Sequence, residues 1–127
     1  MLAISLADFC HKELKDWASM LVFFENEMNS FKKWLMEIST KNSKLHIMKQ
    51  VEHFQNQFIV QKDNFDILNH EIKLHQQLIA KEMQVSNIFD NMDITDQQYF
   101  LRDKMHTAEK IFIALKHEFY NFAGRVL

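Results

Sequence analysis

The sequence predicts an all-helical protein, an antiparallel bundle of three long helices in a single domain over residues 1–127. Three observations lead to this prediction. The chain holds no proline and a single glycine, whereas a β-rich fold of this size needs glycine at several turns. Apolar residues make up 47% of the chain and recur at alternating spacings of three and four. Two short polar stretches interrupt that pattern and divide it into three segments.

The first helix is predicted over residues 5–39. Ser5 and Asp8 resemble a capping box, with Asp in place of the usual Glu. Behind them an unbroken heptad seam predicts packing against long neighbouring helices at a shallow angle. The seam contains Cys10, Leu14, Trp17, Leu21, Phe24, Met28, Phe31, Leu35 and Ile38. Further apolar residues lie outside it, so we expect two packing partners; these residues are Phe9, Val22, Phe23 and Trp34.

The second helix is predicted over residues 43–90, roughly 70 Å long, with Asn42 or Ser43 as its N-cap. Its seam contains Ile47, Val51, Phe54, Phe58, Gln61, Phe65, Leu68, Ile72, His75, Ile79, Glu82, Ser86 and Phe89. A second stripe on the far side, made of Val60, Ile67, Leu74 and Ile88, indicates that the helix is covered from two directions. The alternative is a break near Asp63 and Asn64 that gives a four-helix up-down bundle, with Asp63 as a cap and Asp66 as its reciprocal partner.

The third helix is predicted over residues 95–125, after a turn at Asn91–Ile94. Thr95 and Gln98 form a better capping box, and Gly124 stands where a helix C-terminus favours glycine. The third seam contains Gln98, Leu101, Met105, Ala108, Phe112, Leu115, Phe119, Phe122 and Val126. Because the middle helix is longest, we expect the outer two to pack against its opposite ends and overlap at its centre.

Composition narrows the classes of partner and compartment. Fifteen Lys and Arg against seventeen Asp and Glu do not favour nucleic-acid binding. No apolar run approaches the roughly 20 residues of a membrane span, and the first residues do not resemble a signal peptide. Cys10 is the single cysteine and lies on a seam, so we expect a buried thiol and a reducing, cytoplasmic location.

Self-association is the expected partnership. Helices of unequal length leave seam residues uncovered at both ends, and twelve Phe are more than we expect one narrow bundle to bury. A twofold dimer is the simplest arrangement that covers this surface.

Polar residues on the second seam suggest a candidate site. His75 and Glu82 lie two turns apart and Gln61 is a third polar member, so a single metal ion or another ligand could bind there. We favour a structural role, in which such residues fix register and partner choice. Glu-x-x-His pairs are absent, which argues against a dinuclear metal centre. We expect no cofactor.

The segment Asn69–Leu74 resembles the phosphoacceptor box of sensor histidine kinases. The resemblance implies that His70 accepts a phosphoryl group with Glu71 as its acid/base neighbour. The family's Asn/Thr-Pro is replaced by Leu74-His75, and no glycine-rich ATP-binding segment is present, which excludes autokinase activity. A stand-alone phosphotransfer bundle is the form of this function that the sequence allows.

The segment Val51–Ile59 is similar to a group of uncharacterised small helical proteins of Bacteroidota. The likeness extends from the region of Trp34 to about Glu71, roughly half of the chain. It implies a source and a helical fold, and no activity.

The sequence therefore favours a non-enzymatic bundle that acts by self-association or protein–protein interaction. The alternatives are phosphotransfer at His70 and metal or ligand binding at His75 and Glu82.

Overall fold

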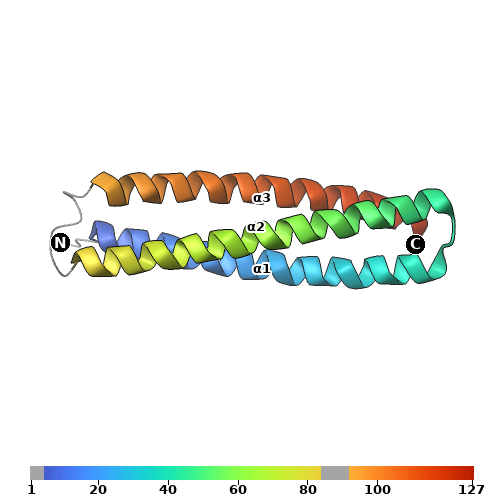
Figure 1. The fold of residues 1–127 in the computed structure, drawn as a ribbon, viewed down its shortest axis with the longest axis horizontal. Coiled ribbons are helices and arrows are strands. Elements are labelled where there is room, and N and C mark those ends of the chain that lie inside the picture. Colours follow the sequence, from blue (N-terminus) through green and yellow to red (C-terminus); the bar gives the residue numbers. More distant parts are fainter. Residues whose placement is uncertain (1–4, 84–91) are drawn as a thin grey trace.

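The computed structural model describes residues 5–83 and 92–127, and they form three helices (Figure 1). Helix α1 spans Leu6–Lys41, α2 spans Leu45–Met83 and α3 spans Met92–Val126. Consecutive helices run in opposite directions, so α1 and α3 are parallel. Neither described stretch contains a strand. The predicted all-helical bundle of three antiparallel helices is confirmed.

Side chains close both ends of α1. Ser5 precedes the helix with an extended backbone, and its Oγ accepts a hydrogen bond from the Asp8 amide at 3.1 Å. This confirms the predicted N-cap. At the other end Asn42 follows the helix, and its Nδ2 donates to the Ile38 carbonyl at 3.1 Å. That bond satisfies one of the last carbonyl groups of α1, which have no partner within the helix.

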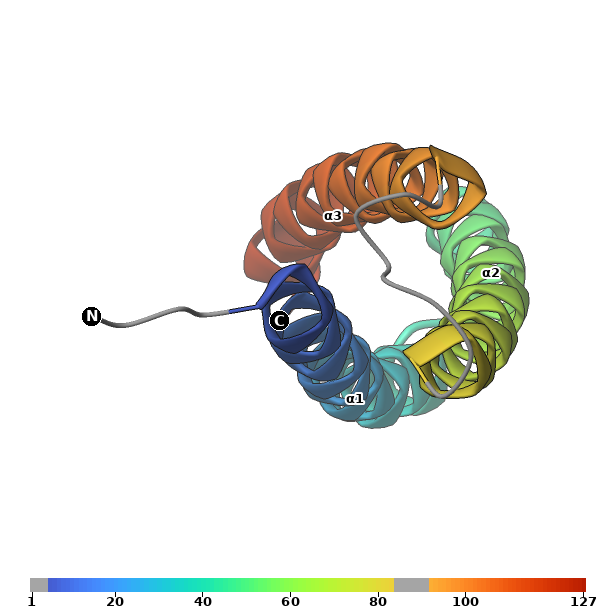
Figure 2. The same cartoon turned by 90° about the vertical axis from the view of Figure 1, so that its left-hand side faces the viewer.

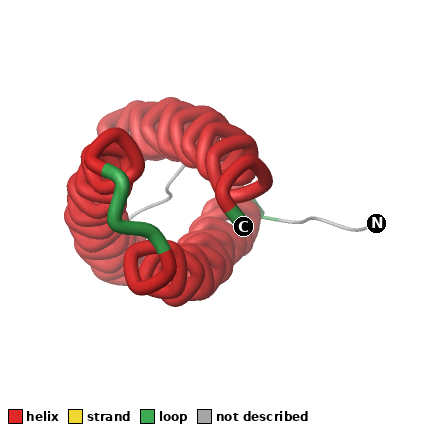
Figure 3. The backbone as a smooth tube through the Cα atoms, turned by 90° about the vertical axis from the view of Figure 1, so that its right-hand side faces the viewer, coloured by secondary structure: helices red, strands yellow, loops and turns green. Residues whose placement is uncertain are grey.

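The loop of residues 42–44 joins α1 to α2 at the end of the bundle where α3 finishes (Figure 3). The Lys44 carbonyl accepts the Ile47 amide at 3.1 Å, so α2 begins at the next residue after Lys44. The prediction that Asn42 or Ser43 caps this helix is therefore wrong. Asn42 already uses its side chain to close α1.

Helix α2 continues through Asp63 and Asn64 without a break, so the four-helix alternative is wrong. Lys62 Nζ lies 2.8 Å from Asp66 Oδ1 one turn further on, and 2.7 Å from Glu25 Oε1 on α1. The Asp66 carboxylate thus supports the helix through an i,i+4 pair. Phe65 is buried beside this pair, which keeps the seam in register through the polar stretch.

Helix α3 begins at Met92, three residues before the predicted start. The predicted turn is wrong for residues 92–94, and Asn91 lies outside the described residues. Thr95 stands inside the helix and so does not cap it. Ile94 is completely buried and extends the third seam by one position. Burying such a side chain stabilises by about 1.5–3 kcal/mol, more than the ~1 kcal/mol of a capping hydroxyl.

The C-terminus of α3 does not use its glycine as predicted. The helix continues through Gly124 to Val126, and no glycine has a positive φ. The Leu127 amide donates to the Ala123 carbonyl at 2.9 Å, which continues the helical hydrogen-bond pattern to the last residue. Gly124 is therefore an ordinary helical position.

The three helices have nearly equal lengths of 36, 39 and 35 residues and lie side by side around one long axis (Figures 1 and 2). The prediction that the outer helices cover opposite ends of the middle one is wrong. Helices α1 and α3 contact each other from Glu13 and Arg102 near one end to Phe31 and Phe119 near the other. The predicted remainder of the second helix, residues 84–90, lies outside the described residues with Ser86, Ile88 and Phe89.

The core follows the predicted seams. Eight phenylalanines are buried, namely Phe24, Phe31, Phe54, Phe58, Phe65, Phe112, Phe119 and Phe122. Helix α1 has the expected two partners, but its contacts come from the seam. Its apolar residues outside the seam are more than half exposed; they are Phe9, Val22, Phe23 and Trp34. One chain thus covers its own described seams, which removes uncovered seam ends as a reason for dimerisation.

Candidate functional site

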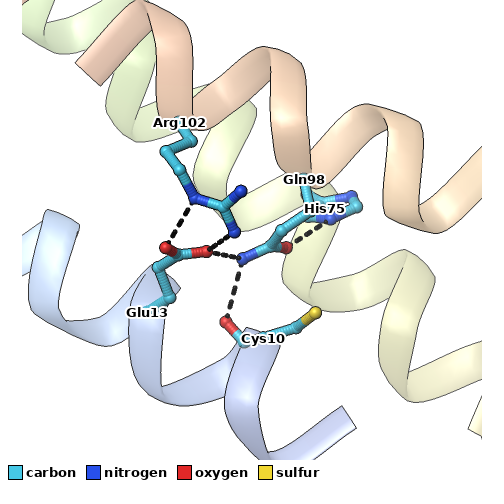
Figure 4. A network of polar contacts seen from close by, with 5 residues as sticks. All are labelled: Cys10, Glu13, His75, Gln98 and Arg102. Atoms are coloured by element: carbon cyan, nitrogen blue, oxygen red, sulfur yellow. Dashed lines mark hydrogen bonds and ion pairs between the residues drawn. The ribbon is translucent and has the colours of Figure 1, made fainter. Parts of the chain in front are cut away.

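A buried polar layer crosses the bundle near the start of α1 (Figure 4). It consists of Glu13 and the Cys10 carbonyl from α1, His75 from α2, and Gln98 and Arg102 from α3. His75 and Gln98 face the bundle axis because both occupy seam positions, and each is 3% exposed. Glu13 and Arg102 flank the seams of α1 and α3 and close the layer toward solvent.

Hydrogen bonds connect these groups in one chain. Gln98 Nε2 donates to Glu13 Oε1 at 2.9 Å and to the Cys10 carbonyl at 3.3 Å. The Gln98 Oε1 atom is therefore an acceptor, and it lies 2.8 Å from His75 Nε2. It follows that Nε2 of His75 carries the proton and that Nδ1 holds the lone pair. Nδ1 is buried and has no hydrogen-bond partner among the described residues.

His75 is held in its neutral form. Burial lowers the pKa of His75 below its ordinary value of 6.5 because the imidazolium ion loses hydration. The hydrogen bond with Gln98 acts in the opposite direction, and the neighbouring His11 adds to the lowering. The imidazole is thus an uncharged link between α2 and α3.

Glu13 is held in its charged form. Burial alone would raise the pKa of Glu13, but hydrogen bonds from Arg102 and Gln98 outweigh it and bring the pKa below 4.5. Arg102 contributes most, since its Nε and Nη2 donate to the two carboxylate oxygens at 2.8 and 2.7 Å. Two-pronged pairs of this kind are the strongest ion pairs of surface residues.

The layer offers little for catalysis. Burial and the Glu13 charge raise the pKa of the Cys10 thiol above 9.0, so the thiol stays protonated and unreactive. Within residues 5–83 and 92–127, no three His, Cys, Asp or Glu side chains are gathered in a way that could hold a metal ion. What the layer does is tie three helices together at one level, which supports the structural reading of His75.

The other polar residues singled out in the sequence lie elsewhere. Gln61 is buried on α2, roughly 20 Å from His75 along the helix, and its Oε1 has no hydrogen-bond partner among the described residues. Glu82 is partly exposed, two turns beyond His75. His70 is exposed on the outer side of α2, as a phosphoacceptor would have to be.

Two apolar grooves lie on the surface between helices. The larger, of about 570 Å³, runs between α1 and α3 and is lined by Phe31, Trp34, Tyr120 and the small residues Ala123 and Gly124, among others. The Glu27–Lys116 ion pair lies beside it, and Lys116 Nζ stands 5.8 Å from the centre of the Tyr120 ring.

The second groove, of about 430 Å³, lies between α2 and α3. Leu74, Leu78 and Phe100 form its apolar wall. The Lys104–Glu71 ion pair borders it, and His75 reaches it from the core. The polar layer therefore lies directly beneath an apolar part of the surface.

Sequence reasoning found His75 and missed its partners. Gln98 was predicted both in a capping box and as the first member of the third seam, but it was not paired with His75. Glu13 and Arg102 carry opposite charges, and each stands next to a seam leucine. Glu13 directly precedes Leu14 on α1, and Arg102 directly follows Leu101 on α3. Parallel helices bring such flanking positions together.

Comparison of the chain with protein-family models, curated proteins and solved structures finds no match. The likeness to small helical proteins of Bacteroidota around Val51–Ile59 therefore stays a prediction. In the described part of the chain, none of the helices is both long and apolar enough to cross a membrane.

Proposed function

We propose that this chain is a non-enzymatic helical bundle that acts by binding protein, and that its first partner is a second copy of itself. The observation that carries the proposal is the exposed stripe of Val60, Ile67 and Leu74 on α2. The sequence pattern predicts that this stripe is covered, and the fold of one chain leaves it open to solvent.

The amount of exposed apolar surface supports the same proposal. Phe100 of α3 is 62% exposed in the groove that also holds Leu74, and Ile111 of the same helix is 45% exposed. Several exposed apolar residues on one surface mark an interaction site more often than a single exposed apolar residue does. The buried, protonated Cys10 is compatible with the reducing cytoplasm that we propose as the location.

Sedimentation equilibrium across the micromolar range tests self-association. We expect a concentration-dependent mass that approaches twice the 15.3 kDa of one chain. A mass that stays at 15.3 kDa over the whole range would overturn the proposal of a self-associating protein.

A further inference from the structure

Exposed apolar residues of α2 and α3 line one surface of the bundle, which we call the α2–α3 face, and the Lys104–Glu71 ion pair lies among them. The face consists of Val60, Ile67 and Leu74 on α2 with Phe100 and Ile111 on α3. The three α2 residues are seven apart, so they point the same way at intervals of roughly 10 Å. All three positions of that seven-residue spacing are apolar, and the polar Asp63 and His70 lie between them on the same side of the helix.

Two contacts fix how the two halves of the face align. Lys104 of α3 binds Glu71 of α2 at 3.0 Å, which sets the level of α3 against α2. Leu74 and Phe100 accordingly line the same groove. Because the helices are antiparallel, Ala114 of α3 lies near the level of Val60 at the other end of the face.

We infer that a second copy of this chain packs on the α2–α3 face, with the two α2 helices antiparallel and Ile67 at a twofold axis. The inference rests on the proposed self-association and adds the surface and the orientation. A twofold interface must be self-complementary, since each copy presents the same patch to the other. The α2–α3 face meets that condition in shape and in charge.

The shapes match across the proposed axis. Ile67 meets the partner's Ile67, while Val60 lies seven residues before it and Leu74 seven residues after it. Val60 therefore meets the partner's Leu74 and enters the groove beside Phe100. On α3 the same axis lies near Thr107, so the large Phe100 faces the small Ala114 of the partner subunit. Large residues set against small ones let two helix layers interdigitate.

The charges match as well. Asp63 and His70 are exposed on the same side of α2, one turn before and one turn after Ile67. The twofold axis places each Asp63 beside the partner's His70, so the pair occurs twice, and the carboxylate accepts a hydrogen bond from the imidazole N–H. Lys104 and Glu71 stay paired when covered, which avoids an unpaired buried charge.

The face between α1 and α3 lacks three apolar residues at this spacing. Phe9 and Phe23 of α1 are exposed there, but Asp16 lies midway between them on the same side of the helix. A helix packed along that face would cover the Asp16–Lys12 ion pair at the central position of that spacing.

Two matched substitutions on α2 test the surface. Ile67 and Ile59 are the same residue type on the same helix and are 56% and 57% exposed, but Ile59 lies outside the face. We expect Ile67→Glu to raise the dimer dissociation constant about 100-fold or more, because the axis places two carboxylates in contact. Ile59→Glu should leave it within about threefold of the wild type. Equal midpoints in urea unfolding of the monomeric fraction show that both variants fold.

Cysteine cross-linking tests the orientation in a Cys10→Ala background. A mixture of Val60→Cys and Leu74→Cys chains should form the mixed disulfide faster than either chain joins itself, and Ile67→Cys should join itself readily. Faster joining of Val60→Cys to itself means parallel helices and overturns the orientation. A dimer that survives Ile67→Glu overturns the α2–α3 face but leaves self-association standing. A monomeric wild type overturns both.

Discussion

The two ends of the bundle solve the packing problem in different ways. From the middle to the end with the 42–44 loop, the core is aromatic: the ring centres of Phe24 and Phe112 lie 4.8 Å apart, and those of Phe31 and Phe119 lie 5.2 Å apart. At the other end, a hydrogen bond between His75 and Gln98 connects α2 and α3 in the core, where the aromatic end has ring contacts. The aromatic end gains from area removed from water and from ring contacts. The hydrogen bonds of the polar layer add little net stability to that end, but they favour one alignment of the three helices.

The largest effect is expected at the aromatic end. Phe112 is completely buried and contacts the rings of Phe24, Phe31 and Phe65. Replacing it by alanine should lower the free energy of unfolding by about 3–5 kcal/mol, through lost burial and the cavity left behind. Urea unfolding followed by circular dichroism measures the loss. A loss below about 1 kcal/mol would mean that this layer is loosely packed and that the contrast between the ends is wrong.

An intermediate effect is expected from Gln98 at the polar end. Gln98→Leu leaves the His75 Nε2–H buried without an acceptor and removes a donor from Glu13, which should cost about 1–3 kcal/mol. The double variant His75→Leu/Gln98→Leu removes both partners of the first bond. It should lose less than the sum of the single variants by about 1 kcal/mol, which a double-mutant cycle measures. Additive losses would show that the bond has no energetic role.

The core residues could be predicted from the sequence, whereas the helix ends could be predicted only in part. The seams gave the core because burial along a helix repeats locally, so Phe112 and Ile72 could be assigned from spacing alone. Helix ends were harder. At Thr95 a capping pattern competed with the burial of Ile94, and at Asn42 one side chain could serve either neighbouring helix.

The candidate site was half predictable for a related reason. His75 and Gln61 appear as polar residues on an apolar seam, which one helix reveals by itself. The pairing of Glu13 with Arg102 depends on how α1 and α3 are aligned along the bundle axis. The two residues are 89 positions apart in the sequence. The periodicity within a single helix does not indicate how two helices are aligned along the bundle axis.

The smallest effect is expected from pH, and it sharpens the role of His75. Its pKa is lower in the folded chain than the ordinary 6.5, so the unfolded chain binds the extra proton first. Stability should therefore fall as the pH drops below about 6.5, with a slope of at most about 1.4 kcal/mol per pH unit from this one group.

Unfolding free energies of the wild type and of His75→Leu at pH 7.5 and 5.5 isolate this contribution. The variant should lose less stability on acidification than the wild type, because it has no imidazole to protonate at this position. Glu13 adds its own loss only at lower pH, since its pKa lies below 4.5. Equal losses for the two chains would mean that His75 is protonated as easily in the fold as outside it.

The odd number of helices has a mechanical consequence. A bundle of two or four antiparallel helices returns the chain to the end where it entered, whereas α1, α2 and α3 carry it from one end to the other. Ser5 and Leu127 therefore lie at opposite ends of the bundle. With helices of 35 residues or more, anything attached to these two points is held roughly 50 Å apart. The fold thus sets the distance between its two ends as well as the surface between them.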